Sequence, residues 1–144
     1  AFERECEILA DDAGTVRVIA GEFAGVRGPA RTVTPVGMLE VRLRMSARFT
    51  LEVDARHDLA VLVMDGAAAT CGRVVARGDF VVFDHRGTGI AIEAQAPSTH
   101  LLVLSGEPID EPLLQDGPFA MNTEREIRRA YADYRAGHFG TLEP

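Results

Sequence analysis

The sequence predicts an all-β protein, a jelly-roll β-sandwich or barrel followed by a single C-terminal α-helix. The first observation is a series of about eight or nine short strand-type segments between residues 15 and 105, separated by turn residues at the spacing typical of such folds. The second is that helical periodicity occurs in one place, after residue 122. A chain of 144 residues has the length of one domain with one core.

The strand region follows a polar and acidic segment, residues 1–14, which we interpret as a lead-in or linker. Residues 15–20 are rich in β-branched side chains, and residues 39–45 alternate apolar and polar, as in strands with one buried face. Residues 59–64 are continuously apolar, which favours a central strand closed by the Asp65–Gly66 turn. Further strands are predicted at residues 49–53, 73–76, 80–83, 89–94 and 99–104.

The helix is predicted to begin after Thr123. As N-cap, this residue can accept the N–H of Glu126 while the Glu126 carboxylate reaches back toward the cap. Gly137 stands where a left-handed helix stop belongs, and Phe119, just before the helix, is expected to be a buried anchor. One apolar stripe recurs at helical spacing and consists of Ile127, Ala130, Tyr131 and Tyr134.

Composition excludes several functional classes. The net charge is −7 and every basic residue is arginine, which argues against direct binding of nucleic acid or of an anionic membrane surface. Cys6 and Cys71 are too few for a disulfide framework. No apolar run approaches a membrane span, and no secretory segment is present, so we expect a cytoplasmic protein. The chain starts at Ala1 without an initiator Met, and we expect it to be a piece of a longer polypeptide.

The C-terminal run carries a family resemblance. The motifs Gly106-Glu107-Pro108 and Gly117-Pro118-Phe119, then Asn122-Thr123, Glu126 and Gly137, resemble the closing signature of the pirin family, whose members are two-domain cupins. The segments 17–21 and 57–66 are similar to earlier parts of the pirin C-terminal domain. The resemblance implies a cupin-type barrel over residues 15–105, with residues 106–144 as the turn and helix tail of the same domain.

The resemblance also implies a function for the whole protein. Pirin-like proteins include metal-dependent quercetin 2,3-dioxygenases, with iron or another divalent metal in the N-terminal half. This chain would then be the structural C-terminal half, inactive alone, with the N-terminal cupin domain as its partner. We expect the apolar stripe of the helix to be exposed in the absence of the N-terminal domain or to pack against a second copy of the chain. The alternative is a regulatory protein–protein interaction module, a transcription cofactor or metabolic-enzyme regulator without catalysis. A third hypothesis is a cupin that binds a small organic molecule.

No metal site is predicted in this half, and no catalytic or cofactor-binding residue. A cupin iron site needs imidazole and carboxylate ligands that converge on one ion. The chain has four histidines and no His-x-His pair; the family's ligand positions fall near Glu52, Asp54 and Asp58. His57 and His100 are the weak candidate ligands, although a hydrogen-bonded structural histidine is the favoured interpretation of both.

Overall fold

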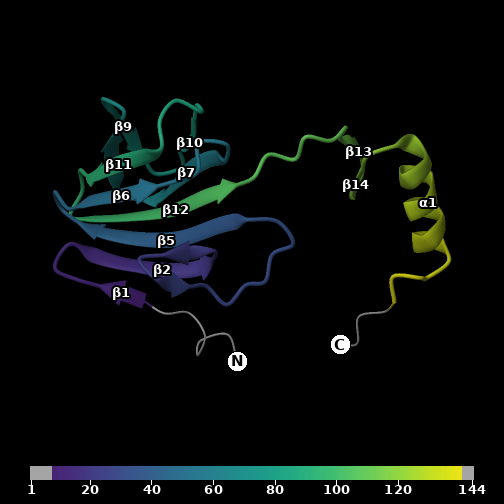
Figure 1. Cartoon of the computed structure of the whole chain (residues 1–144), viewed down its shortest axis with the longest axis horizontal. Helices are drawn as coiled ribbons and strands as arrows, with labels where there is room; N and C mark the ends of the chain where they lie inside the picture. The colour runs from purple at the N-terminus through teal and green to yellow at the C-terminus, as the bar shows by residue number, and fades with distance from the viewer. Residues whose placement is uncertain (1–7, 141–144) are drawn as a thin grey trace. The chain divides into compact units, whose positions relative to one another are not determined.

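Two antiparallel sheets form the larger part of the structure, a computed structural model that describes residues 8–140 (Figure 1). The six-stranded sheet has the order β1 (Ile8–Ala10), β2 (Gly14–Ala20), β5 (Val36–Arg44), β12 (Ser98–Gly106), β7 (Asp58–Asp65) and β10 (Phe80–Phe83). The four-stranded sheet has the order β6 (Arg48–Glu52), β11 (Gly89–Ala94), β8 (Ala67–Thr70) and β9 (Arg73–Ala76). The remaining elements are the hairpins β3 (Glu22–Phe23) with β4 (Val26–Arg27) and β13 (Leu114–Asp116) with β14 (Phe119–Met121), and the helix α1 (Glu124–Arg135).

The predicted all-β fold with one C-terminal helix is confirmed. Two strands of the sheets were not predicted. β1 lies within the segment that the sequence indicates as a lead-in, and it pairs with β2 at the edge of the larger sheet. β8 follows the Gly66 turn directly, where three consecutive alanines carry no strand signal of their own.

The core lies between the inner faces of the two sheets, because successive side chains of a strand point to opposite faces. In β5, Leu39, Val41 and Leu43 are buried, whereas Glu40 and Arg42 lie on the outer face. The buried cluster draws on both sheets and consists of Val18, Leu39, Val41, Leu43, Phe49, Leu59, Val61, Val63, Ala68, Ile92, Ala94, Leu101 and Val103.

Two details fix the strands in the interior. Thr99 of β12 is fully buried, and its hydroxyl donates to the carbonyl oxygen of Ala67 in β8 at 2.8 Å, which joins the two sheets. Gly66 has a φ of 76°, and a Cβ there would lie 2.3 Å from the carbonyl oxygen of Ser98. Glycine is therefore required at the position where the sequence predicts the turn.

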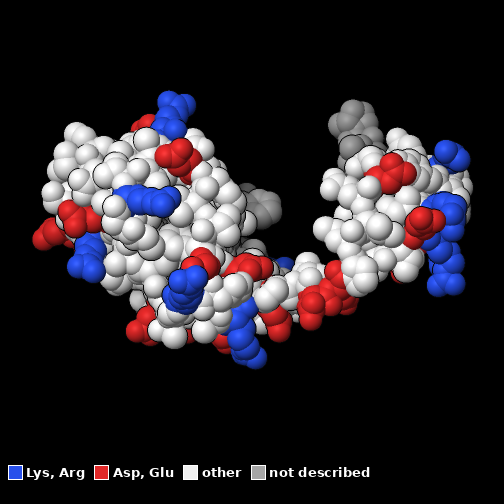
Figure 2. Space-filling model, turned by 90° about the horizontal axis from the view of Figure 1, so that it is seen from above, with Lys and Arg blue, Asp and Glu red and all other residues white. Residues whose placement is uncertain are grey.

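Packing divides the chain into two compact units, one up to Pro108 and one from Ile109. At the junction, acidic side chains gather at Glu107, Asp110 and Glu111, all exposed (Figure 2). The second unit consists of the β13–β14 hairpin and α1, which contact each other.

The helix begins where the sequence predicts. Thr123 is the N-cap, and its hydroxyl oxygen accepts the backbone N–H of Glu126 at 3.3 Å and donates to the Glu126 carboxylate at 2.8 Å. Gly137, with a φ of 74°, follows the last helical turn and confirms the predicted stop. With 12 residues, α1 cannot cross a membrane, and no other helix among residues 8–140 could do so.

The apolar stripe of the helix is only partly covered within this unit. Ile127 and Ala130 are buried, but Tyr134 is 65% exposed. The expectation of a buried Phe119 is wrong, because its ring is half-buried. It contacts Tyr131 edge-on at 4.9 Å and stacks on Phe139 at 6.0 Å, in a unit too small to enclose it.

Two signature residues have clear structural roles. Gly117 has a φ of 54°, and a Cβ there would lie 2.6 Å from the hydroxyl of Tyr131, which donates to the carbonyl oxygen of Asp116 at 3.3 Å. The amide of Asn122 donates to the carboxylate of Glu111 and so ties the hairpin exit to the preceding loop. These contacts explain why the motif specifies the geometry of the hairpin and helix.

Candidate functional site

The residues at the family's expected ligand positions do not converge. Glu52 is exposed at the end of β6. The Asp54 carboxylate accepts the side chain of Arg56 at 2.8 and 3.1 Å and the Arg56 backbone N–H at 2.9 Å. These hydrogen bonds from Arg56 hold the pKa of the Asp54 carboxyl well below its usual range. Asp54 is therefore paired with a neighbouring guanidinium and not with another ligand-type side chain.

Asp58 pairs elsewhere. Its carboxylate lies 3.1 Å from Nε2 of His85, and the other ring nitrogen of His85 lies 3.3 Å from the carbonyl oxygen of Ala55. Both side chains are more than half exposed. Across residues 8–140, no group of three or more His, Cys, Asp or Glu side chains could hold a metal ion. The described residues therefore do not fit the cupin iron site.

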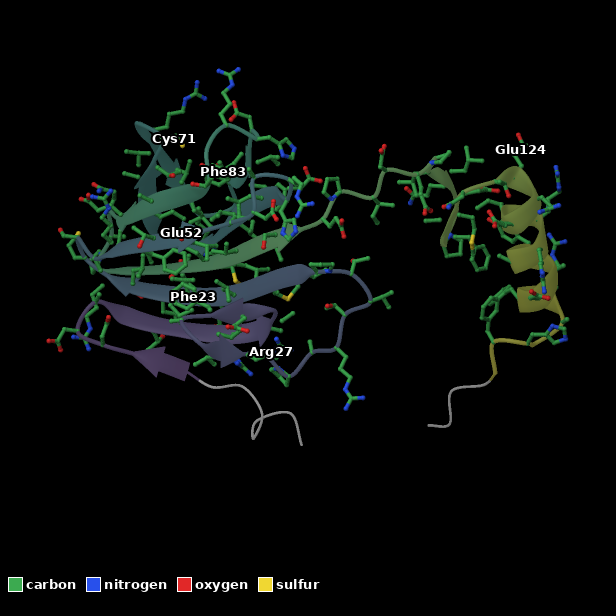
Figure 3. All side chains as sticks on the ribbon, viewed as in Figure 1. Phe23, Arg27, Glu52, Cys71, Phe83 and Glu124 are labelled. Atoms are coloured by element: carbon green, nitrogen blue, oxygen red, sulfur yellow. The ribbon has the colours of Figure 1, made fainter. Side chains whose placement is uncertain are left out.

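His57 is half-buried and lies between two clefts, both of which it lines together with Val53. One cleft has a volume of about 970 Å³, with Leu39 and Val103 of the larger sheet in its wall. The other has a volume of about 630 Å³ and is lined by Thr70, Phe83 and Ile90 among others. Figure 3 labels Arg27 and Glu52 of the first cleft and Cys71 and Phe83 of the second.

The walls of these clefts combine apolar strand residues with charged side chains, such as Arg27 and Glu52 in the first cleft and Asp54 and Arg86 in the second. Most inward positions of the strands are aliphatic, and the Thr70 hydroxyl in the second cleft donates to the carbonyl oxygen of Ala91 at 3.0 Å. His57 shares the second cleft with Asp54 and His85, but it belongs to no group of three or more ligand-type side chains among residues 8–140 that could hold a metal ion.

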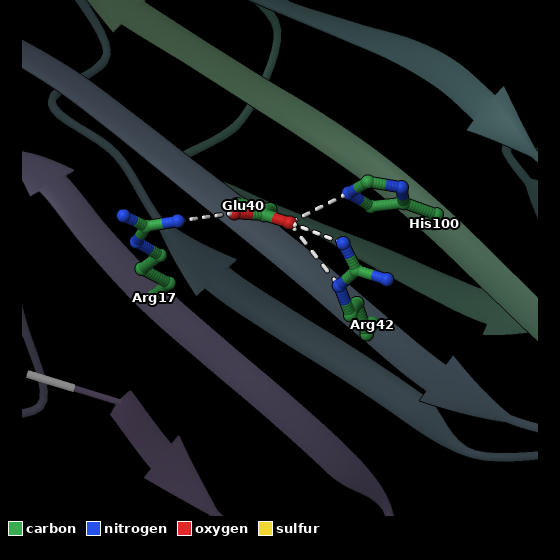
Figure 4. Close-up of polar contacts among 4 residues, drawn as sticks. All are labelled: Arg17, Glu40, Arg42 and His100. Carbon is green, nitrogen blue, oxygen red and sulfur yellow. Dashed lines mark hydrogen bonds and ion pairs between the residues drawn. The ribbon is translucent and has the colours of Figure 1, made fainter. Parts of the chain in front are cut away.

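His100, the other candidate ligand, lies on the outer face of the larger sheet and so outside the barrel interior. Its Nε2 lies 2.9 Å from Oε1 of Glu40, a side chain of the neighbouring strand β5 (Figure 4). Arg42 donates to the same oxygen at 2.8 and 3.1 Å, and Arg17 of β2 lies 3.4 Å from the other oxygen, Oε2. We call these four residues the Glu40 cluster. The cluster thus places His100 at ion-pair distance from a carboxylate on the outer face, away from the barrel interior.

The cluster holds Glu40 in its charged form. Its burial by itself would raise the pKa of the Glu40 carboxyl, but the hydrogen bond and charge of Arg42, together with His100, outweigh that effect and lower the pKa below its ordinary value. The side chains of Glu40 and His100 are each 17% exposed. The cluster has neither a nucleophile nor an open coordination position, so it acts as an ion-pair network across three strands.

Sequence reasoning did not find this cluster. Its members come from residues 17, 40, 42 and 100, and they meet because Arg17 is paired with Glu40 and His100 with Arg42 across the sheet. The sequence indicated only that Glu40 and Arg42 point to the same, outer face, because they alternate with apolar residues along one strand. Which neighbours face them depends on strand order and register.

Comparison with known proteins identifies the family. A sequence model of the Pirin C-terminal cupin domain matches residues 38–140, well over half of the chain. The chain belongs to the pirin family. The predicted resemblance to the pirin C-terminal cupin domain is confirmed, including the signature from Gly106 to Gly137 that lies within the matched range.

The relatives of this pirin domain include pirins and quercetin dioxygenases. It is 37% identical over 131 residues to a Pseudomonas aeruginosa protein whose name assigns it provisionally to the quercetin 2,3-dioxygenases, with 91% of this chain and 46% of that protein covered. It is 28% identical over 128 residues to human pirin, covering 86% of this chain and 44% of that protein. A solved quercetin 2,3-dioxygenase from Acinetobacter baumannii has a TM-score of 0.89 at 31% identity and covers 97% of this chain and 49% of its own.

The chain thus spans about half the length of the curated relatives it matches. The matched half carries the cupin fold, and the fold class is confirmed by the solved dioxygenase. The activity that the relatives' names state belongs to proteins with a further half.

Proposed function

We propose that this chain is the structural half of a two-cupin, pirin-type protein whose chemistry resides in the other half. The reaction would be of the quercetin 2,3-dioxygenase type, with iron or another divalent metal bound outside this chain. The observation that carries the proposal is the state of the residues at the family's ligand positions. Asp54 is held by Arg56 and Asp58 by His85, while Glu52 faces solvent.

The histidines support the same proposal. A metal-binding imidazole in a cupin needs an unprotonated nitrogen aimed at the barrel interior, with further ligands around it. His100 instead lies beside Glu40 on the outer face of the larger sheet. His57 belongs to no group of three or more ligand-type side chains among residues 8–140. This half would then support the fold of the two-cupin protein, and the residues of its two clefts would form part of the wall of the site in the other half.

The proposal predicts that the 144-residue chain, purified alone, contains transition metal well below one equivalent and does not consume dioxygen in the presence of quercetin. Because Asp54 and Asp58 are held in ion pairs and no group of three ligand-type side chains occurs among residues 8–140, adding Fe²⁺ should not produce activity. Elemental analysis and an oxygen-electrode assay measure both quantities.

The proposal is contradicted if the purified chain contains stoichiometric metal and the His57→Ala or His100→Ala variant has lost that metal. A polypeptide that joins the N-terminal half of the Pseudomonas relative to this chain serves as the positive control for metal and for activity.

The regulatory interaction module is the second candidate function. It is favoured by the exposed aromatic side chains of the second unit, with Tyr134 at 65% and Phe139 at 62% exposure, and by the acidic net charge of −7, which suits a protein partner better than nucleic acid. A joined two-half polypeptide that binds metal but leaves quercetin unchanged would favour this function over catalysis.

A further inference from the structure

The inner face of the larger sheet changes character at one end of β5 and β12. The side chains of these strands that point between the sheets are aliphatic and buried at Leu39, Leu101 and Val103. The next inward positions are Gly37 and Ser105, which are paired directly across the two strands. Neither residue fills space as leucine or valine would, so the aliphatic lining ends here in a small side chain that carries a hydroxyl.

The pair is built so that the hydroxyl has room. A Cβ on residue 37 would lie 2.4 Å from Oγ of Ser105, and glycine there lets the hydroxyl take this position. Ser105 is half-buried, and its hydroxyl has no hydrogen-bond partner among residues 8–140. It can therefore donate to, or accept from, a molecule that lies beside it.

The first cleft, of about 970 Å³, opens at this pair. Gly37 and Ser105 line it from the larger sheet, and Leu51 and Val53 line it from the end of β6. Sites for small molecules typically have volumes of about 300–1,000 Å³ and mainly apolar walls with a few polar groups. In size and lining, the first cleft matches such a site.

One wall of the cleft, residues 28–35, is anchored at both ends. The backbone N–H of Ala30 donates to the carbonyl oxygen of Ile19 at 3.1 Å, and the N–H of Glu107 donates to the carbonyl oxygen of Pro35 at 3.2 Å. The wall is thus tied to the strands of the larger sheet before any ligand arrives, as in sites that are largely pre-formed.

The charges of the lining indicate the class of ligand. Its charged residues are Arg27, Arg31, Glu22 and Glu52, whose formal charges cancel, and Arg27 lies 3.4 Å from Glu22. An organic anion or a polyphosphate would need an excess of cations, which this lining does not provide. Among the described residues, no Phe, Tyr or Trp side chain lines the cleft, so a flat ring finds no aromatic partner to stack on.

We propose that the first cleft binds a small uncharged molecule with an aliphatic body and one hydroxyl or carbonyl group. The body lies against Leu39, Leu51 and Val103, where each Å² removed from water contributes about 25 cal/mol. The polar group forms a hydrogen bond with the Ser105 hydroxyl. This binding is independent of the proposed function, since the ligand is held by this chain whether or not the cleft also borders a site in the other half.

The test uses 1-hexanol as the ligand and hexanoate as its matched anion, each titrated into the 144-residue chain. Two-dimensional ¹H–¹⁵N NMR locates the binding. Hexanol should cause saturable shifts centred on Gly37, Leu51 and Ser105, and hexanoate should bind more weakly, because its carboxylate loses hydration without gaining a free cation.

Two serines of β12 form a matched pair of variants. Ser105→Ala should weaken hexanol binding about fivefold, the factor expected for one neutral hydrogen bond. Ser98→Ala, at an exposed position of the same strand and outside the cleft, should leave the affinity unchanged. Gly37→Ala is the second route, since its Cβ would displace the hydroxyl and should weaken binding at least as much.

The proposal is overturned by shifts that do not saturate or that lie away from the cleft. It is also overturned if Ser105→Ala and Ser98→Ala have equal effects, or if hexanoate binds more tightly than hexanol. The Tm of each variant shows whether it is folded, and if Ser105→Ala is not, Gly37→Ala decides. Metal content and dioxygen consumption report separately on the proposed function and do not change with any of these outcomes.

Discussion

Glu40, on the outer face of the larger sheet, forms ion pairs with side chains of its own strand and of two neighbouring strands. Its carboxylate lies between Arg42 and His100 on one oxygen and Arg17 on the other, and the side chain is only 17% exposed. A carboxylate removed from water in this way is stable only because cations replace its hydration. It therefore links β2, β5 and β12 while the strands' inner faces form the core.

We predict that Glu40→Gln destabilises the chain by about 1.5 kcal/mol at pH 7, a typical value for hydrogen bonds to a charged group. Because the folded pKa of Glu40 is lowered from 4.5, its stabilising contribution is present above that ordinary value and is lost as the pH falls through the folded pKa. Urea unfolding of both proteins between pH 7 and pH 3 measures the difference, which should shrink toward low pH. A difference that stays constant over this range would show that Glu40 does not act through its charge.

At the scale of elements, β12 is the central strand on which the larger sheet depends. It pairs with β5 on one side and β7 on the other, and its residues alternate between full burial and the outer face. Leu101 is fully buried in the core, whereas the next residue, Leu102, is half-buried on the outer face. The two leucines are chemically identical and differ only in the face they occupy.

We predict that Leu101→Ala costs about 2–5 kcal/mol in the chain alone, because it leaves a cavity between the sheets. Leu102→Ala should cost about 1 kcal/mol or less, since much of its side chain already contacts water. The free energies of unfolding from urea titrations give both values. Equal costs would mean that the two faces of β12 are equally enclosed in solution.

At the scale of the whole molecule, the chain consists of two compact units, one up to Pro108 and one from Ile109. All described residues of the buried cluster lie between Val18 and Val103, within the first unit. The second unit buries Ile127 and Ala130 within its own helix and hairpin region.

We therefore predict that a chain ending at Pro108 retains a cooperative thermal transition with a Tm within about 5 °C of the full 144 residues. Circular dichroism in the β region and differential scanning calorimetry follow the transition. If this shorter chain fails to fold, residues 106–144 belong to the same folding unit, as the family resemblance implies.

The sequence by itself determined the fold class, the turn at Gly66, the capped helix after Thr123 and the family. Each of these depends on local information: alternation, turn residues, capping residues and a contiguous motif. It also identified the ligand positions as lacking a His-x-His pair. It did not predict β8, whose three alanines are strand residues only because β9 and β11 pair with them.

Only the tertiary structure decided where the candidate residues point and what they meet. His100 could have faced the barrel or the outside by sequence alone, since a shift of one residue in register exchanges the two faces. The sheet pairing places it beside Glu40, sixty positions earlier in the chain, and it aligns Phe80, Leu62 and Leu102 into one apolar row. These contacts join residues distant in sequence, so they arise from strand order and register and leave no local pattern to read.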